Sequence, residues 1–202
     1  MERAPMLNPV PFMTFTFVMS ITPGPNNVML TASGANFGFR RTLPHIGGVG
    51  FGFAVQLLAV CAGLSALFSR WPALQVLLGW AGAAYLVYLG WHLLAGAARE
   101  AGAQTDARPV SFLEAAMFQS LNPKAWMMSL GAATLFMPQE LELLARVAYM
   151  LAITVGIMLP SMAVWALFGS SLRGVLSVPR ARVGFNVAMA LALAVTAVMM
   201  VR

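Results

Sequence analysis

Residues 22 to 27 read T-P-G-P-N-N, and they interrupt an apolar stretch that runs from about residue 8 to about residue 33. Proline and glycine are the two residues that the interior of an α-helix tolerates least. A lipid bilayer, however, accepts little backbone other than helix, because lipid offers no partner to a free N–H or C=O group. The stretch therefore predicts a membrane-embedded helix that is broken at a defined point.

The composition indicates a membrane protein. The 202 residues are 60% hydrophobic and 9% charged, whereas a soluble domain is about half apolar and about a quarter charged. We therefore expect an all-α integral membrane protein in which residues 1–202 form a single domain. The formal charge of +6 comes from basic residues scattered between apolar runs. These residues should meet anionic lipid headgroups, and no nucleic-acid partner is expected.

The residue types argue against several other classes of membrane protein. A thiol-redox carrier needs two exchanging cysteines, and Cys61 is the single cysteine. Clustered metal ligands are absent from the sequence, so we expect no metal and no cofactor. An ATP-driven pump is disfavoured because no G-x-x-x-x-G-K-[ST] loop occurs. The two histidines lie near span ends without a mid-membrane acid, which argues against a hydrolase and against any enzyme.

Six apolar runs are long enough to cross a membrane, which requires about 20 residues. A polar connection, residues 97–111, divides them into two groups of three. The first group forms repeat one, about residues 8–96, and the second forms repeat two, about residues 112–201. The six predicted spans cover about residues 8–33, 44–68, 72–96, 112–137, 146–170 and 183–201.

The arginines predict the orientation, since cytoplasmic loops are enriched in basic residues. One side of the predicted topology has more of them than the other, so it should be cytoplasmic and both termini should lie outside, in the periplasm. The richer side holds Arg40, Arg41, Arg99, Arg108, Arg173, Arg180 and Arg182, and the poorer side holds Arg3, Arg70, Arg146 and Arg202.

The helix break occurs twice. P-N-N-V-M-L-T-A, from Pro25, can be laid over P-K-A-W-M-M-S-L, from Pro123. Both segments lie in the first span of their group, and because three is odd the second group enters the membrane from the opposite side. This is the arrangement of an inverted-topology repeat, in which interrupted helices form a transport site.

The residues at each break favour a particular ligand. Pro25 and Pro123 suit the first position of a new helix, Asn122 suits the N-cap before it, and Gly24 allows a turn or a close approach of ligand. The free N–H groups of the new helices attract a carboxylate. We expect the last carbonyls before each break, at 19–22 and 118–121, to receive an ammonium group. Both features together suit an α-amino acid.

Four polar side chains extend this predicted substrate site. An ionisable residue in a span costs at least about 2.5–3.5 kcal/mol, so Lys124 could hold the substrate carboxylate or exchange a proton. Alternatively, its side chain reaches the membrane surface. Asn26 and Asn27 either contact substrate or only satisfy backbone groups that the prolines free. Gln56 in the second span is a further substrate-contact candidate, or it joins two helices.

Three stretches carry a resemblance to a known family. They are T-P-G-P-N-N-V-M-L-T-A-S-G-A-N-F-G-F-R-R-T-L-P-H from residue 22, W-A-G-A-A-Y-L-V-Y-L-G-W at 80–91 and N-P-K-A-W at 122–126. They resemble the LysE/RhtB family of bacterial amino-acid exporters, and the first is most similar to the branch that exports cysteine and O-acetylserine. The resemblance implies a six-span carrier of the inner membrane that expels amino acids or their derivatives, driven by the proton gradient.

The resemblance also implies site residues. It implicates Pro23, Gly24, Pro25 and Asn26 in the first break, and Asn122, Pro123 and Lys124 in the second. Some relatives place an acid soon after the paired glycines of the second span. Here that stretch reads G-V-G-F-G-F-A-V-Q, so coupling through such a carboxylate is not available to this chain.

The predicted function is therefore secondary-active export by alternating access around two broken helices. The alternatives are an exporter of another small solute and a non-transporting subunit of a membrane assembly. Besides the amino-acid substrate and lipid, a second copy of the chain is a candidate partner. Gly47, Gly48, Gly50 and Gly52 give the second span a smooth face, for which close helix packing is the simplest explanation.

Overall fold

The computed structural model describes residues 8–64, 68, 70–99 and 108–201, and all regular structure in this part of the chain is helical. Most of the predicted connection 97–111 lies outside these residues, as do Arg3 and Arg202 from the orientation argument. The elements are α1 (Val10–Ile21), α2 (Pro25–Phe37), α3 (Phe39–Ala59), the π-helix η1 (Val60–Leu64), α5 (Pro72–Arg99), α6 (Phe112–Leu121), α7 (Pro123–Phe136), α8 (Leu143–Ser171), the 3-10 helix η2 (Leu172–Ser177) and α9 (Pro179–Met200).

Four helical segments in the described residues are long and apolar enough to cross a membrane: Phe39–Leu64, Pro72–Ala95, Leu143–Ser177 and Pro179–Met200. They match the predicted spans at 44–68, 72–96, 146–170 and 183–201. The predicted start of the first of these at Pro44 is wrong, because α3 begins at Phe39 and contains Pro44. The reason is Gly38, whose φ of 86° turns the chain directly from α2 into α3.

The other two predicted spans, 8–33 and 112–137, are each divided into two short helices. α1 and α2 contain 12 and 13 residues, and α6 and α7 contain 10 and 14. Each piece is shorter than the roughly 20 residues that a spanning helix needs. The structure thus confirms an interruption at each proline-containing motif, whereas a six-span topology remains a prediction.

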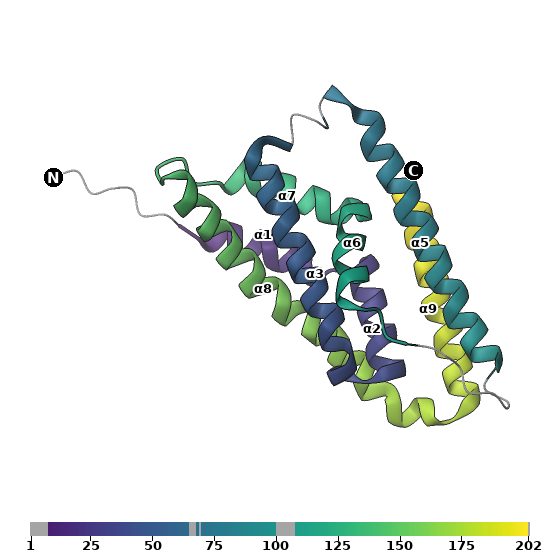
Figure 1. Ribbon diagram of the computed structural model, residues 1–202. Coiled ribbons are helices and arrows are strands. Elements are labelled where there is room, and N and C mark those ends of the chain that lie inside the picture. The colour runs from purple at the N-terminus through teal and green to yellow at the C-terminus, as the bar shows by residue number, and fades with distance from the viewer. Residues whose placement is uncertain (1–7, 65–67, 69, 100–107, 202) are drawn as a thin grey trace.

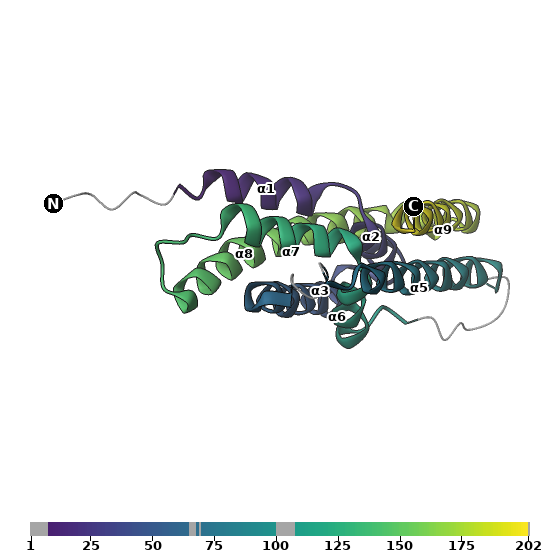
Figure 2. The ribbon, with the colours of Figure 1, turned by 90° about the horizontal axis from the view of Figure 1, so that it is seen from above.

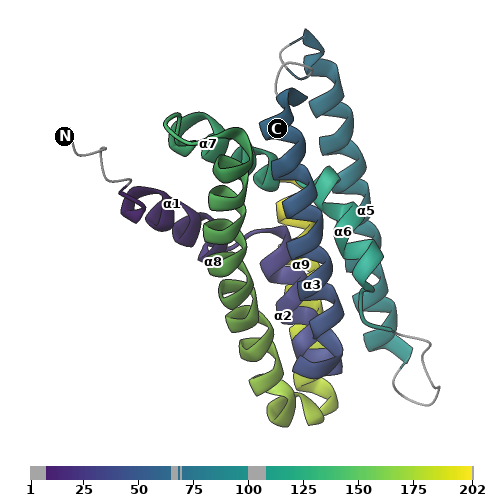
Figure 3. The same ribbon diagram turned by 60° about the vertical axis from the view of Figure 1, so that its left-hand side comes forward.

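The short helices of the two broken stretches lie together. In Figure 1, α5 and α9 run side by side, while α1 lies against α8 on the opposite side of the molecule, and Figure 3 shows α1 projecting sideways from α8. Figure 2 shows α1 and α7 next to each other on that side. Phe136 of α7 joins them, with its ring centroid 5.4 Å from that of Phe12 and 5.2 Å from that of Phe15. One short helix from each half of the chain therefore packs against the other.

Glycines bring α2 and α8 into backbone contact. A Cβ atom at Gly34 of α2 would overlap the carbonyl of Ala166, and one at Gly169 of α8 would overlap the carbonyl of Thr31. Small residues at such positions allow close approach, which is how helices associate where the hydrophobic effect is weak. This contact fixes α2, the second helix of the first broken stretch, on a helix of the other half of the chain.

A second glycine contact fixes α6. Cβ atoms at Gly48 and Gly52 of α3 would overlap the carbonyls of Phe112 and Ala116 on α6. The prediction that this glycine-rich face serves close helix packing is confirmed for these two positions. One helix of each broken stretch, α2 or α6, therefore packs through glycine contacts against a long helix of the opposite half of the chain.

Alanine substitutions in α8 test the α2–α8 contact. Gly→Ala gains about 0.8–1.0 kcal/mol in a helix interior, but overpacking at Gly169 costs about 1–3 kcal/mol. We expect Gly169→Ala to lower the midpoint of thermal unfolding in detergent. Gly156→Ala is the matched control, because a Cβ there would meet no described atom within 4 Å, and its midpoint should equal or exceed that of the wild type. Equal midpoints for the two variants would contradict the contact.

Candidate functional site

The first break forms because two consecutive signals end one helix and start another. α1 ends at Ile21, and the hydroxyl of Thr22 donates to the carbonyl of Val18 at 2.8 Å. Gly24 is extended, and Pro25 occupies the first position of α2, as predicted. The first intrahelical bond of α2 runs from Val28 N to Gly24 O. The N–H groups of Asn26 and Asn27 therefore have no acceptor within their own helix.

The second break is a capped helix start. Asn122 is the N-cap of α7, its Oδ1 accepts from Lys124 N at 3.1 Å, and Pro123 takes the first helical position. The predicted roles of both residues in the helix start are confirmed. Asn122 is 2% exposed, so a buried side chain satisfies one of the free backbone donors at the start of α7.

Lys124 connects the two breaks. Its Nζ donates to Thr22 O at 2.8 Å, to Thr22 Oγ1 at 3.0 Å and to Pro23 O at 3.2 Å. An ammonium group has three donors, so these contacts use them all. All three acceptors are neutral oxygens. Lys124, in the second broken stretch, thus binds the first one. This contact argues against the alternative in which its side chain only reaches the membrane surface.

Gly24 makes room for this lysine. A Cβ atom at Gly24 would lie 2.9 Å from Lys124 Cδ and 3.1 Å from its Nζ. The φ of Gly24 is −174°, an extended conformation that any residue adopts. The glycine therefore allows the close approach of Lys124, whose flexible side chain would have to shift if residue 24 carried a Cβ atom.

The two asparagines at the start of α2 do different things. Asn27 Nδ2 donates to Ser20 O at 3.0 Å and Thr22 O at 2.7 Å, so it satisfies backbone groups freed by the break. Asn26 Nδ2 donates to Gln119 Oε1 on α6 at 2.8 Å. Its Oδ1 is buried without a hydrogen-bond partner among the described residues, and so is the hydroxyl of Ser20.

The prediction that the carbonyls before the breaks are free for an ammonium group is wrong for several of them. Besides the contacts of Asn27 and Lys124, the indole Nε1 of Trp165 donates to Ile21 O at 3.1 Å. The indole Nε1 of Trp126 donates to Ser120 O at 2.9 Å. Side chains from α7 and α8 supply these donors because lipid supplies none.

A small cavity of about 40 Å³ lies between the breaks. One water molecule needs about 10–15 Å³ on the same measure, so the cavity holds a few water molecules and is too small for an amino acid. It is lined by Met19, Ser20, Gly24, Pro25, Asn26, Asn27, Phe53, Gln119, Asn122, Lys124, Ala125, Met128, Met158 and Met162.

The cavity gathers most of the predicted site residues. Pro23 contributes its carbonyl to Lys124, and Pro123 starts α7 without lining the cavity. Gln56 does not line it either: it is buried in α3, and both polar atoms of its side chain have no hydrogen-bond partner in the described part of the chain.

Sequence reasoning missed Gln119, the hydroxyl of Ser20 and the methionines of the cavity wall. Gln119 carried a usable signal, because it is a polar residue inside an apolar run, three positions before the N-cap Asn122. The four methionines come from α1, α7 and α8. Methionine is common in ordinary cores, so their convergence could only be seen in the fold.

Comparisons with known proteins bear on this site. The chain matches the family described as LysE type translocator over residues 17–202. It is 36% identical over 137 residues to the cysteine/O-acetylserine efflux proteins of Escherichia coli strain K12 and Shigella flexneri serotype 5b strain 8401, covering 67% of this chain and 69% of each relative. The efflux protein of the same description from Escherichia coli O1:K1 shows the same identity and coverage. No solved structure matches the chain.

The cap of α7 can be tested by substitution. Asn122→Ala removes the side-chain acceptor for Lys124 N, and losing an N-cap costs about 0.5–2 kcal/mol. We expect a lower midpoint of thermal unfolding for this variant, whereas Asn122→Ser, which retains an acceptor, should stay close to the wild type. If the alanine and serine variants unfold at the same temperature, the cap does not stabilise the break.

Proposed function

Because this chain belongs to the LysE type translocator family, we propose that it exports amino acids or amino-acid derivatives across the bacterial inner membrane. The relatives named cysteine/O-acetylserine efflux protein support small α-amino acids as the substrate class. The single structural observation on which the proposal rests is the contact of Lys124 with the opposite break, beside a cavity that contains unpartnered polar atoms.

The cavity offers complementary groups to both charges of an α-amino acid. The ammonium of Lys124 and the N–H groups at the start of α2 suit a carboxylate, since the N-terminus of a helix carries partial positive charge. Asn26 Oδ1 and the hydroxyl of Ser20 are buried acceptors without partners in the described residues, and they suit an ammonium group. These acceptors take the role that the sequence assigned to backbone carbonyls.

The size of the cavity sets a condition on binding. Because the cavity has a volume of only about 40 Å³, the two breaks must separate before an amino acid can enter. Lys124 provides a means, because a substrate carboxylate is a stronger acceptor for an ammonium than the neutral oxygens of Thr22 and Pro23. In this proposal the substrate carboxylate replaces the oxygens of Thr22 and Pro23 as the acceptor of the Lys124 ammonium. The two halves of the chain are then free to move apart.

Alternating access is the transport mechanism that we propose. The two broken stretches start corresponding halves of the chain and meet through Lys124 and through Asn26 with Gln119. In carriers with inverted repeats, such broken helices form the substrate site while the repeats rock around it. We further propose six passages through the membrane, both termini in the periplasm and coupling to the proton gradient.

Lys124→Met tests the proposal. The variant loses a positive charge that should hold the carboxylate, and a hydrogen bond to a charged group is worth about 1.5–3 kcal/mol. We expect export to fall by about tenfold or more, while the amount of protein in the membrane changes little. The measurement is release of amino acids from cells loaded with dipeptides, compared with cells that lack the protein.

Arg41→Met serves as the control, because Arg41 is exposed and does not line the cavity. Wild-type rates for Lys124→Met would remove Lys124 from the substrate site. Release no greater than that of cells without the protein, for the wild type and for every amino acid, would contradict the proposed function itself.

A further inference from the structure

A second cavity lies on another side of α2, and none of the predicted site residues lines it. Its volume is about 230 Å³, against about 40 Å³ for the central cavity. It is formed between α2, α5, α9 and the segment that leads into α6. Met29, one turn beyond Asn26 along α2, lines this second cavity, whereas Asn26 lines the central one. The two cavities therefore share one helix as a wall.

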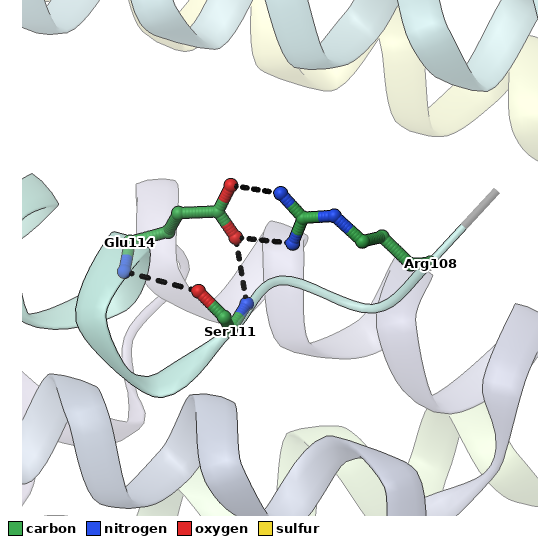
Figure 4. A network of polar contacts seen from close by, with 3 residues as sticks. All are labelled: Arg108, Ser111 and Glu114. Atoms are coloured by element: carbon green, nitrogen blue, oxygen red, sulfur yellow. Dashed lines mark hydrogen bonds and ion pairs between the residues drawn. The ribbon is translucent and has the colours of Figure 1, made fainter. Parts of the chain in front are cut away.

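The second cavity contains a pair of opposite charges (Figure 4). Arg108 Nη1 donates to Glu114 Oε2 at 2.7 Å, and Nη2 donates to Oε1 at 2.6 Å. Glu114 also accepts from Ser111 N at 2.8 Å, while Ser111 Oγ accepts from Glu114 N at 3.3 Å. This capping box at the start of α6 fixes the carboxylate in place. Hydrogen bonding to Glu114 raises the pKa of Arg108, so the guanidinium stays charged.

The other walls are aromatic and apolar. The rings of Tyr88 and His92 meet edge to face with centroids 4.4 Å apart, and the ring centroid of Tyr85 lies 6.2 Å from that of Tyr88. Leu89 and Met29 complete the wall beside them. A cavity with a few polar groups set in apolar and aromatic walls is the usual form of a small-molecule site.

We propose that this second cavity binds the amino acid in its zwitterionic form, with the carboxylate on Arg108 and the ammonium group on Glu114. An α-amino acid carries both charges on neighbouring atoms, so it can align with the pair while each protein charge keeps a charged partner. The side chains of Arg108 and Glu114 are 65% and 37% exposed, and an ion pair this exposed contributes little stability, so opening it for a ligand costs little.

This inference rests on the proposed function, and it adds an initial binding site that substrate occupies before it reaches the central cavity. In the proposed orientation Arg108 lies on the cytoplasmic side of the membrane. In this inference the second cavity therefore receives substrate from the cytoplasm. Its larger volume accommodates what the closed central cavity cannot.

The test uses everted membrane vesicles, in which the cytoplasmic face is outside and export appears as uptake. The probe is radiolabelled L-cysteine under reducing conditions, supplied over a range of concentrations. We expect Arg108→Gln and Glu114→Gln to raise the half-saturating concentration about tenfold, with a much smaller effect on the maximal rate. Glutamine at 114 keeps the capping box, so helix α6 still starts normally. Lys124→Met should lower the maximal rate instead.

A cavity-filling variant separates binding from a purely structural ion pair. Leu89→Trp occupies the second cavity and leaves both charges intact, so it should raise the half-saturating concentration as well. Arg41→Gln removes an exposed charge outside the cavity and should leave the saturation curve unchanged. Wild-type curves for Arg108→Gln and Glu114→Gln, or for Leu89→Trp, would overturn the inference while wild-type uptake upholds the proposed function. No uptake of L-cysteine by the wild type would overturn the inference for this substrate, and it would remove the proposed function as well only if the loaded cells also release no amino acid above the control.

Discussion

The bond between the Lys124 ammonium and the carbonyls of Thr22 and Pro23 is the interaction on which the rest of the site depends. A charged lysine among apolar helices is costly, and here it is compensated by three oxygen acceptors at 2.8–3.2 Å. Gly24 suits this contact, since a Cβ atom there would push the Lys124 side chain aside. The bond also holds the two broken stretches together, although they are about 100 positions apart in the chain.

Breaking a helix in lipid creates polar backbone groups that the protein itself must satisfy. Asn27, Trp165 and Trp126 do so for the carbonyls, and Asn122 does so for a backbone N–H. After this accounting, the hydroxyl of Ser20 and Oδ1 of Asn26 remain as the unpartnered buried side-chain atoms among the described residues of the cavity wall. Together with the N–H groups at the start of α2, which have no acceptor within their own helix, these acceptors suit a small zwitterion that supplies the missing partners.

The sequence allowed prediction of those features that depend on local chemistry. Pro25, Pro123 and Asn122 start helices where they were expected to, because proline and an N-cap act within one turn. The long apolar helices could also be predicted, from their length and composition. The contacts of Lys124, Gln119 and Trp165 could not be predicted, since they depend on how helices from different parts of the chain rotate toward each other. The start of α3 at Phe39 was missed because Gly38 joins two helices without a loop.

The most direct test of this account is an experimentally determined structure of the protein in lipid, without and with L-cysteine. Without ligand, Lys124 Nζ should lie within hydrogen-bond distance of Thr22 O and Pro23 O, and helices should end at Ile21 and Leu121. With ligand, the amino-acid carboxylate should contact Lys124 at the start of α2. A continuous helix through residues 22–24 or through residue 122, or a Lys124 side chain directed to the membrane surface in both structures, would contradict the account.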